Sequence, residues 1–268
     1  MSRIKQCFEQ LDAAHKSALV TFITAGDPNP EITVSLMRAM VEAGANILEL
    51  GIPFSDPMAD GPVIQKANER ALAHNVALRD VIGMVRQFRQ SDQQTPVVLM
   101  GYLNPIETLG YDSFAELAAE AGVDGVITVD IPPEEAEDYL RALRGRGIDP
   151  VFLLAPTSDS ERIARICEAA GGFVYYVSVK GTTGSATFAI GEVASKVFEI
   201  RKATRLPVGV GFGIKDAESA QAVAQVADAV IVGSVLVKQI EALADEPESI
   251  APALALTISQ MREAMDLI

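Results

Sequence analysis

The sequence predicts a single domain across residues 1–268, folded as a (β/α)8 TIM barrel with extra helices at both ends. Eight short apolar runs recur along the chain, and helical patterns lie between them. Most of these runs lack strict alternation, which is typical of parallel strands covered on both faces. Eight βα units in about 250 residues match the size of such a barrel. A doubly wound sheet is the competing fold, but it usually has fewer strands and needs a switch point.

Each expected strand is followed by a loop and then by a helical pattern with its own boundary signals. The strands are expected at 18–26, 46–54, 96–102, 125–131, 149–156, 173–181, 206–214 and 229–236. Asp27 or Asn29 is the expected N-cap of the first intervening helix, and Ser158 or Ser160 that of a later one. The segment 244–253 has the composition of a turn before a final helix, and no linker divides the chain.

Composition limits the possible partners and sites. A net charge of -14 disfavours nucleic acid and anionic membranes, because both require a basic patch. No long apolar run suggests a membrane span, and the N-terminus lacks the hydrophobic segment of a signal peptide, so we expect a cytoplasmic protein. The two cysteines and two histidines are too few and too scattered for a disulfide framework or a metal site.

The stretch "LELGIPFSDPMADGP" (48–62) places one glutamate inside an apolar strand and two aspartates on the loop that follows. If Glu49 faces the barrel interior, burial raises its pKa and lets it exchange protons near neutral pH. Asp60, on the loop, is expected to be better solvated and to remain ionised. Such a pair could perform acid–base catalysis. Alternatively, Glu49 is a structural acid bonded to a barrel hydroxyl, and Asp60 is a turn former.

Glycines at the ends of the last two strands suggest a phosphate site. The segments "GVGFGI" (209–214) and "IVGSVL" (231–236) would let a phosphate approach backbone amides and a helix N-terminus, with Ser234 adding a hydroxyl. This arrangement needs no lysine or arginine, which suits an acidic chain. The alternative is that the glycines serve only tight packing.

Two further features allow more than one interpretation. Lys180, in "SVKGTTG", could form a Schiff base with a carbonyl substrate, although an exposed lysine beside a loop is the commoner situation. Phe22, Tyr175 and Phe212, near strand ends, could form the wall of a flat apolar pocket, or they could simply pack in the core.

The motifs "ELGIPFSDPMADGP", "GTTG" and "GFGI", in this order and over nearly the whole chain, resemble the tryptophan synthase alpha subunit family. The resemblance implies the retro-aldol cleavage of indole-3-glycerol phosphate to indole and glyceraldehyde 3-phosphate. It implies no cofactor on this chain. It also implies an αββα complex, in which indole passes through a tunnel to a β subunit that carries pyridoxal phosphate.

The resemblance also implies roles for individual residues. Glu49 would take the proton of the glycerol hydroxyl and protonate the indole ring carbon, while Asp60 would hold the indole N–H. Thr183 would meet Asp60 when two loops close. The phosphate would be bound by Gly184, Gly213, Gly233 and Ser234. The indole would be enclosed by Phe22, Met100, Ile127, Tyr175 and Phe212, with Leu153 behind. The β subunit would dock on Pro53, Phe54, Asp56 and Asn104.

The chain departs modestly from the family pattern. It has Thr182 where the family more often has valine, and Met100 where the family more often has leucine. Neither change removes a required group. Two other functions remain open from the residues: another phosphate-binding barrel, such as an aldolase that uses Lys180, and a barrel without activity that serves as an allosteric partner. The presence of both Glu49 and Asp60 argues against the latter.

Overall fold

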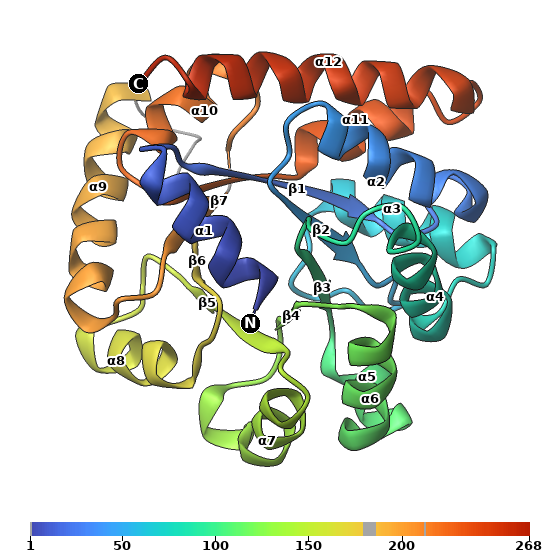
Figure 1. Ribbon diagram of the computed structural model, residues 1–268, viewed down its shortest axis with the longest axis horizontal. Coiled ribbons are helices and arrows are strands. Elements are labelled where there is room, and N and C mark those ends of the chain that lie inside the picture. Colours follow the sequence, from blue (N-terminus) through green and yellow to red (C-terminus); the bar gives the residue numbers. More distant parts are fainter. Residues whose placement is uncertain (1, 179–185, 212) are drawn as a thin grey trace.

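The computed structural model describes residues 2–178, 186–211 and 213–268, and its strands form one closed parallel barrel in chain order (Figure 1). This confirms the predicted (β/α)8 fold. Most strands end earlier than expected, because the chain turns into loops at their carboxyl ends. The strands are β1 (Ala18–Thr24), β2 (Ile47–Gly51), β3 (Val97–Gly101), β4 (Gly125–Thr128), β5 (Asp149–Leu154), β6 (Val174–Val177), β7 (Val208–Gly211) and β8 (Ala229–Val232).

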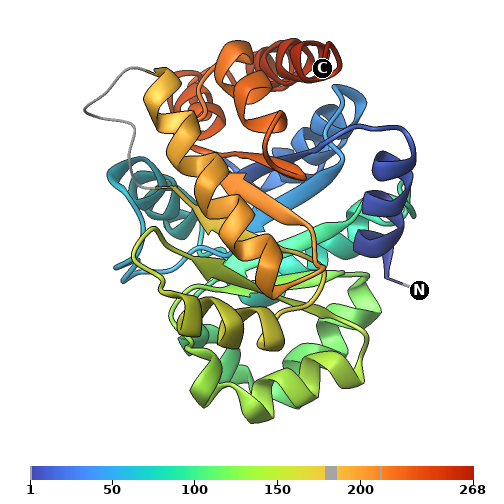
Figure 2. The ribbon, with the colours of Figure 1, turned by 90° about the vertical axis from the view of Figure 1, so that its left-hand side faces the viewer.

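Helices surround the barrel on its outer side (Figure 2). Not one helix within the described ranges combines the length and the apolarity that crossing a bilayer requires. Two short 3-10 helices, η1 (Pro30–Ile32) and η2 (Pro133–Glu135), precede α2 and α7. The α-helices are α1 (Arg3–Ala13), α2 (Thr33–Glu42), α3 (Pro62–Ala73), α4 (Leu78–Phe88), α5 (Leu103–Leu109), α6 (Tyr111–Ala121), α7 (Glu137–Gly145), α8 (Ser160–Ala169), α9 (Ala186–Ala203), α10 (Ala217–Ala224), α11 (Ser234–Ala242) and α12 (Pro247–Met265).

The strands are buried on both faces, which explains their near-continuous apolar sequences. Alternate residues such as Val20, Ile47 and Val98 pack together inside the barrel. Their neighbours, such as Leu48 and Leu99, face the helices and belong to the larger outer core. Because successive side chains of a strand point to opposite faces, both layers need apolar residues.

Helix α1 covers the N-terminal end of the barrel. Ile4 and Phe8 are buried and pack onto the inner cluster, and Gly125 lies so close to Ile4 that an added Cβ would come within 3.0 Å of its Cδ1 atom. Figure 1 shows α1 crossing the strands at this end. The carboxyl ends of the strands therefore form the end of the barrel that α1 does not cover.

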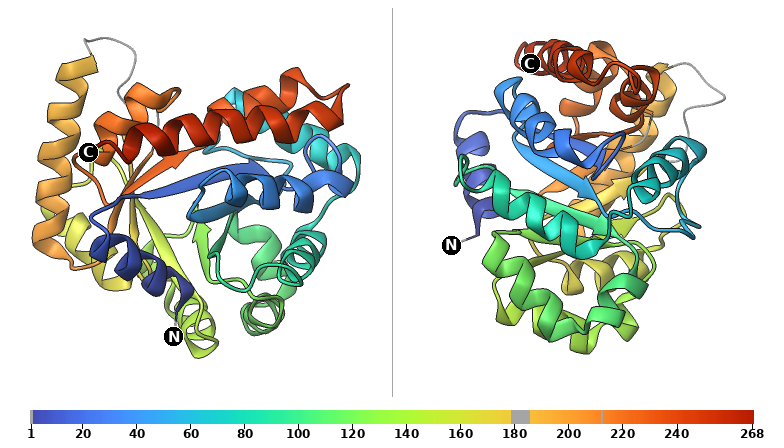
Figure 3. Two further views of the ribbon diagram at one scale, coloured as in Figure 1. Left: turned by 45° about the horizontal axis from the view of Figure 1, so that its top comes forward. Right: turned by 90° about the vertical axis from the view of Figure 1, so that its right-hand side faces the viewer.

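Some helix boundaries differ from those expected. Asn29 caps η1 rather than a long helix, and its side chain accepts the Glu31 N–H at 2.9 Å. Asp159, not a neighbouring serine, caps α8 by accepting the Arg162 N–H at 2.8 Å. Helix α12 already begins at Pro247, inside the expected turn, and packs along α2, α10 and α11 (Figure 3).

An ion-paired cluster lies at the amino ends of β3 and β4. The Asp124 carboxylate accepts hydrogen bonds from Arg89 at 2.7 Å, from Arg3 at 2.8 Å and from the Val97 N–H at 2.8 Å. Arg89 also donates to the Gly122 and Thr95 carbonyls, at 2.9 and 2.7 Å. Both members of the buried pair therefore have most of their hydrogen-bonding groups satisfied.

Candidate active site

The predicted pocket residues within the described ranges lie on the inner faces of the strands, toward their carboxyl ends. Glu49 is the third residue of β2 and stands between Phe22 of β1 and Val98 of β3 in the strand register. The other pocket residues in this region are Met100, Ile127, Leu153 and Tyr175. A TIM barrel has its chemistry at this end, so the prediction and the fold agree on the location.

Glu49 is buried and has no cationic partner among the residues that the structure describes. Its side chain is 2% exposed, and its Oε2 atom has no hydrogen-bond partner among the residues that the structure describes. Burial raises the pKa of this carboxyl from 4.5 to about 8. Near neutral pH both protonation states are therefore within easy reach, as a proton-transferring group requires. The described residues offer no barrel hydroxyl bonded to Glu49, so the purely structural interpretation finds no support here.

Tyr175 and Phe22 fill the space around Glu49, and two glycines make room for their rings. A Cβ added to Gly211 would meet the Tyr175 hydroxyl and lie 2.7 Å from Cε2. A Cβ added to Gly51 would lie 2.8 Å from Cζ of Phe22. Burial, and then the nearby charge of Glu49, raises the pKa of Tyr175 well above its usual value. The Tyr175 hydroxyl therefore stays protonated beside the glutamate.

Asp60 is held more firmly than its loop position suggested. Its carboxylate accepts a hydrogen bond from Asn68 Nδ2 at 3.5 Å, and the Tyr102 hydroxyl accepts the N–H of the neighbouring Ala59 at 2.9 Å. Burial nevertheless raises the pKa of Asp60, outweighing the opposing effects of the nearby Tyr102 and Asn68 side chains. Asp60 is half-buried and so better solvated than Glu49, as expected, but α3 and the end of β3 enclose the turn enough to raise its pKa as well. Both carboxyls of the pair resist ionisation, Glu49 more strongly.

Sequence reasoning missed Tyr102 and Asn68, although each left a signal. Tyr102 follows the β3 strand directly, at a position where barrel residues approach the active site. Asn68 is a polar residue on the inner face of α3 and is only 4% exposed. A buried asparagine requires hydrogen-bond partners, and Asp60 is an acid two turns of helix earlier in the chain, whereas the adjacent Glu69 is exposed.

The structure describes only three of the four residues predicted to bind phosphate. Gly213 is exposed and has a φ of 77°, a conformation that favours glycine. Gly233 is the N-cap of α11, and the exposed Ser234 is its first residue. The first-turn amides of this helix provide the positive potential that the acidic chain otherwise lacks. The other site predictions, Lys180, Thr183, Gly184 and Phe212, lie outside the described residues.

The predicted docking residues surround the loop after β2. Asp56 and Asn104 are exposed, and Phe54 is half-buried with its ring stacked on Tyr102 at a centroid distance of 5.1 Å. Pro53 is buried within the chain. Met58 on the same loop is 85% exposed and borders a hollow of about 380 Å³.

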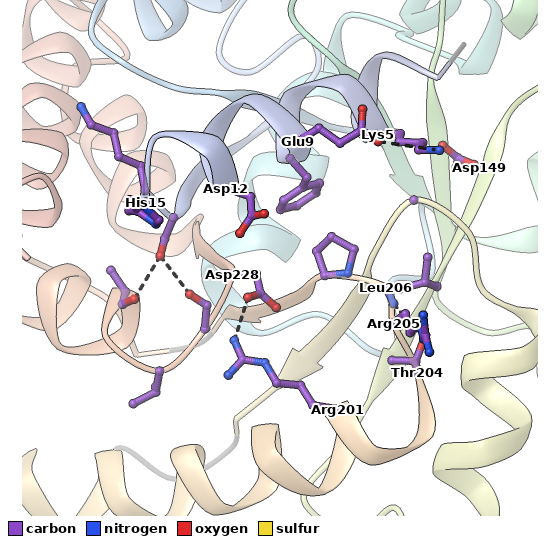
Figure 4. Close-up of a pocket in the computed structure, with 18 of the residues that line it drawn as sticks. Lys5, Glu9, Asp12, His15, Asp149, Arg201, Thr204, Arg205, Leu206 and Asp228 are labelled. Atoms are coloured by element: carbon purple, nitrogen blue, oxygen red, sulfur yellow. Dashed lines mark hydrogen bonds and ion pairs between the residues drawn. The ribbon is translucent and has the colours of Figure 1, made fainter.

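A second hollow, of about 1060 Å³, lies at the opposite end of the barrel beneath α1 (Figure 4). Several of its polar groups already have partners within the chain. Arg201 bonds Asp228 at 2.7 Å, and Ser17 donates to the Ala224 and Ala227 carbonyls at 3.0 Å. None of the predicted site residues lines it. Its size alone therefore does not make it a competitor for the active site.

Comparison with known proteins decides the family. A family model described as tryptophan synthase alpha chain matches residues 8–266. The chain belongs to this family. It is 61% identical to the tryptophan synthase alpha chain of Thioalkalivibrio sulfidiphilus over 266 residues, which cover 99% of this chain and 100% of that protein. The corresponding protein of Marinobacter nauticus is 58% identical over 99% of this chain and 98% of its own length.

Solved structures agree with this assignment. The tryptophan synthase alpha subunit of Legionella pneumophila superposes with a TM-score of 0.94 at 48% identity, covering 100% of both chains. A chain from a tryptophan synthase structure of M. tuberculosis in an open form superposes with a TM-score of 0.88 at 35% identity, covering 99% of each. Membership in the tryptophan synthase alpha chain family confirms the expected lyase activity on indole-3-glycerol phosphate and its place in tryptophan biosynthesis.

Proposed function

We propose that this tryptophan synthase alpha chain cleaves indole-3-glycerol phosphate with Glu49 as the proton-transferring group and Asp60 as the acceptor of the indole N–H. The observation that supports this most strongly is Glu49 itself, a buried carboxyl with a pKa of about 8 and an Oε2 atom unpartnered among the described residues. A buried acid without a cation is costly to the fold, and such groups concentrate at catalytic sites.

The reaction requires one proton to move between two neighbouring atoms of the substrate. The ring carbon C3 must gain a proton, and the hydroxyl on the adjoining side-chain carbon must lose one. The carbon–carbon bond then breaks, its electron pair returns to the ring system, and the hydroxyl carbon becomes the aldehyde of glyceraldehyde 3-phosphate. Because these atoms are adjacent, one carboxyl can serve both. With a pKa of about 8, Glu49 starts mostly protonated at neutral pH, donates to C3 and then accepts the hydroxyl proton.

Asp60 contributes at the ring nitrogen. Protonation at C3 turns the indole into an indolenine cation, whose positive charge resides largely at the nitrogen. A carboxylate that accepts the N–H stabilises this charge more than it stabilises the neutral substrate, so the interaction lowers the barrier. The hydrogen bond from Asn68 supports this role, because it favours the ionised form of Asp60 against the effect of burial.

The substrate phosphate would bind at Gly213, Gly233 and Ser234, together with the predicted Gly184. The N-terminus of the nine-residue α11 supports this proposal, because its free amides favour an anion. The apolar side chains of Phe22, Met100, Ile127, Leu153 and Tyr175 would hold the indole. Thr183, which would meet Asp60, and Phe212, which would help enclose the indole, also belong to the proposal, and both lie outside the described residues.

We further infer that the chain assembles with a β subunit into an αββα complex, to which it delivers indole. The exposed Asp56, Met58 and Asn104 around the β2 loop support a docking surface there. Pyridoxal phosphate belongs to the β partner in this proposal. The cytoplasmic location expected from the N-terminal sequence remains a prediction.

Indole release from indole-3-glycerol phosphate tests the proposed roles. Wild type, Glu49→Gln and Asp60→Asn are assayed alone and with a tryptophan synthase β subunit, beside the exposed control Glu42→Gln. We expect both site variants to lose most of their activity while staying folded, and the control to match wild type. Full activity of Glu49→Gln would remove the assigned proton shuttle. If wild type releases no indole even with the partner, the alternatives of a docking-only subunit and of a Lys180 aldolase would have to be tested.

A further inference from the structure

An ion-paired cluster joins three of the elements that carry the proposed active site. Asp27, on the loop after β1, is fully buried, and its carboxylate accepts two hydrogen bonds from the guanidinium of Arg70 in α3, from Nε at 2.6 Å and from Nη2 at 2.9 Å. The other terminal nitrogen of Arg70, Nη1, lies 3.5 Å from a carboxylate oxygen of Glu241 in α11. One arginine therefore connects the β1 loop with two helices.

The same three elements share a small apolar core. Phe22 of β1, Ala67 of α3 and Val237 of α11 are buried together, and Met100 packs against them. Ala67 and Arg70 are three residues apart, so they lie on the same side of α3. The side of α3 that carries the arginine is thus packed next to Phe22 and Met100, two of the side chains proposed to hold the indole.

Asp27 is a fixed anchor for the arginine. Its N–H donates to the Thr24 carbonyl at 3.2 Å, and the N–H of Gly26 donates to the hydroxyl of Thr33, the first residue of α2, at 3.0 Å. The Asp27 side chain is shielded from solvent, whereas that of Glu241 is 35% exposed. Bidentate bonds to a shielded carboxylate are stronger than an exposed ion pair, so we expect the contact with Asp27 to hold α3 in place and Glu241 to add less.

Helix α3 in turn holds the turn that carries Asp60. It begins at Pro62, two residues later; Asn68 donates to the Asp60 carboxylate at 3.5 Å, and Gln65 donates to the Asp60 carbonyl at 2.8 Å. Helix α11 begins at Ser234, where the substrate phosphate is proposed to bind. The substrate must reach from Asp60 to this phosphate site, so the placement of α3 against α11 decides whether both of its ends bind in the reactive geometry.

We propose that Arg70 is a positioning residue for catalysis, which fixes α3 against the β1 loop and α11 and thereby places the Asp60 carboxylate at the indole nitrogen. The proposal rests on the roles assigned above to Asp60 and to the N-terminus of α11. Arg70 acts through its own helix, by way of Asn68 and Gln65. Arginine suits this role because its planar guanidinium binds two carboxylates at fixed angles, which a lysine ammonium does not.

Two substitutions of Arg70 separate its charge from its geometry. Arg70→Met removes the cation, whereas Arg70→Lys keeps a cation beside Asp27 but loses the bidentate contact. A displacement of about 1 Å at a catalytic group can lower the rate about a hundredfold, so we expect kcat to fall by about tenfold to a hundredfold in Arg70→Met and by less in Arg70→Lys. Because the lysine variant leaves no buried acid without a cation, the test does not depend on the folding of the methionine variant.

The matched control is Arg89→Met, which breaks a buried arginine–aspartate pair at the other end of the barrel. It should lose stability in urea comparable to that lost by Arg70→Met. At a temperature where all variants are folded, it should keep kcat within about twofold of wild type, because Asp124 and Arg89 touch no proposed substrate position. An equal loss of kcat in both methionine variants would show that general destabilisation, not positioning, lowers the activity, and would overturn the inference.

A double-mutant cycle shows whether Arg70 acts through Asp60. If it does, Arg70→Met should lower kcat much less in a chain that already carries Asp60→Asn, whose residual indole release is measured over long incubation. A role in general stability would lower kcat by the same factor in both backgrounds. Equal factors would therefore overturn the inference.

Solvent exchange of the Asn68 side-chain amide hydrogens, followed by NMR, provides a readout that does not depend on activity. The signals are assigned by their disappearance in Asn68→Ala. We expect exchange about tenfold faster in Arg70→Met than in wild type, because a loosened α3 opens more often, and no change in Arg89→Met. Unchanged exchange together with unchanged kcat would overturn the inference. Faster exchange in Arg70→Met, with full activity of Asp60→Asn, would instead contradict the role proposed for Asp60 and leave the link between Arg70 and α3 established.

Discussion

Asp124 near the N-terminal end of the barrel and Glu49 toward its C-terminal end are both buried acids, 6% and 2% exposed, but their surroundings differ. Asp124 receives Arg89, Arg3 and a backbone N–H. Glu49 has apolar neighbours and the Tyr175 ring, and its Oε2 atom has no partner among the described residues. The carboxylate of Asp124 therefore has cationic and hydrogen-bonding partners within the fold, whereas Glu49 has no such set among the described residues.

The difference teaches how the same side-chain chemistry serves two purposes. A buried carboxylate that is bonded to several segments of the chain joins them, so its removal affects folding. A buried carboxyl without a cation destabilises the fold when ionised, but it can gain and lose a proton near neutral pH. The barrel thus separates stability at one end from chemistry at the other.

The largest expected effect is a loss of turnover in Glu49→Gln, which is compared with the turnover of Asp124→Asn. The first variant should lower kcat by about 10²- to 10⁴-fold, the usual contribution of a general acid–base group. The second should keep kcat within about twofold of wild type at a temperature where it is folded, because Asp124 touches no proposed substrate position. Steady-state indole release measures both values. Equal losses would show that the two ends are not functionally separate.

The pH dependence of stability sharpens the same comparison. Glu49 has a pKa of about 8 in the folded protein against 4.5 ordinarily, so between these values the folded state retains a proton that the unfolded chain has lost. Wild-type stability should therefore fall, relative to Glu49→Gln, as pH rises from about 4.5 to 8, and the difference should stay constant above pH 8. The full difference is at most about 5 kcal/mol, at about 1.4 kcal/mol per pKa unit.

Urea unfolding of wild type and Glu49→Gln at pH 5, 7 and 9 measures this difference, with the exposed Glu42→Gln as control. The control should follow wild type at every pH. Parallel curves for Glu49→Gln and wild type would mean that Glu49 ionises in the folded protein as easily as in water, and its proposed role as a proton donor would fail.

The position of Glu49 could be predicted from sequence because local pattern determines it. Its apolar neighbours Leu48 and Leu50 indicate a buried strand, and alternation puts the glutamate on the opposite face. The placement of Gly233 and Ser234 between β8 and α11 was equally accessible, since a glycine between a strand and a helix is a local signal. These features depend on adjacent residues, so the fold adds little to them.

The environment of Asp60 could not be predicted in the same way. Asn68 of α3 donates to its carboxylate, and Tyr102 at the end of β3 accepts the N–H of the neighbouring Ala59, so the turn is enclosed by side chains from two other elements of the fold. The prediction of the α8 cap was wrong for another reason. Asp159 and its serine neighbours all offer side-chain oxygens that can cap a helix, and the backbone conformation decides which of them does so. Loop burial and cap choice thus depend on tertiary structure.

A smaller effect is expected at the N-terminal end from Arg89→Met. This change keeps much of the side-chain volume but leaves Asp124 with the ion pair to Arg3 alone among the described residues, and it removes the donors to the Gly122 and Thr95 carbonyls. We expect a loss of about 3 kcal/mol in the free energy of unfolding. The matched control is Arg141→Met, whose ion pair with Asp138 is 69% exposed on both sides and should contribute less than about 1 kcal/mol. If both variants unfold alike, the buried cluster is not what stabilises this end.

The smallest effect, Gly211→Ala, tests whether packing at the C-terminal end serves the substrate rather than the fold. The added methyl group would lie 2.7 Å from Cε2 of Tyr175, so the ring must move toward the proposed indole pocket. Overpacking of this kind costs about 1–3 kcal/mol. We expect KM for indole-3-glycerol phosphate to rise about tenfold, because the displaced ring reduces the space for the indole.

Gly83→Ala in α4 is the control, since nothing lies within 4 Å of its added Cβ and alanine favours a helix. It should be slightly more stable and fully active. A Gly211→Ala variant with lower stability but unchanged KM would mean that Tyr175 moves away from the substrate, and the ring would then belong to the core rather than to the pocket.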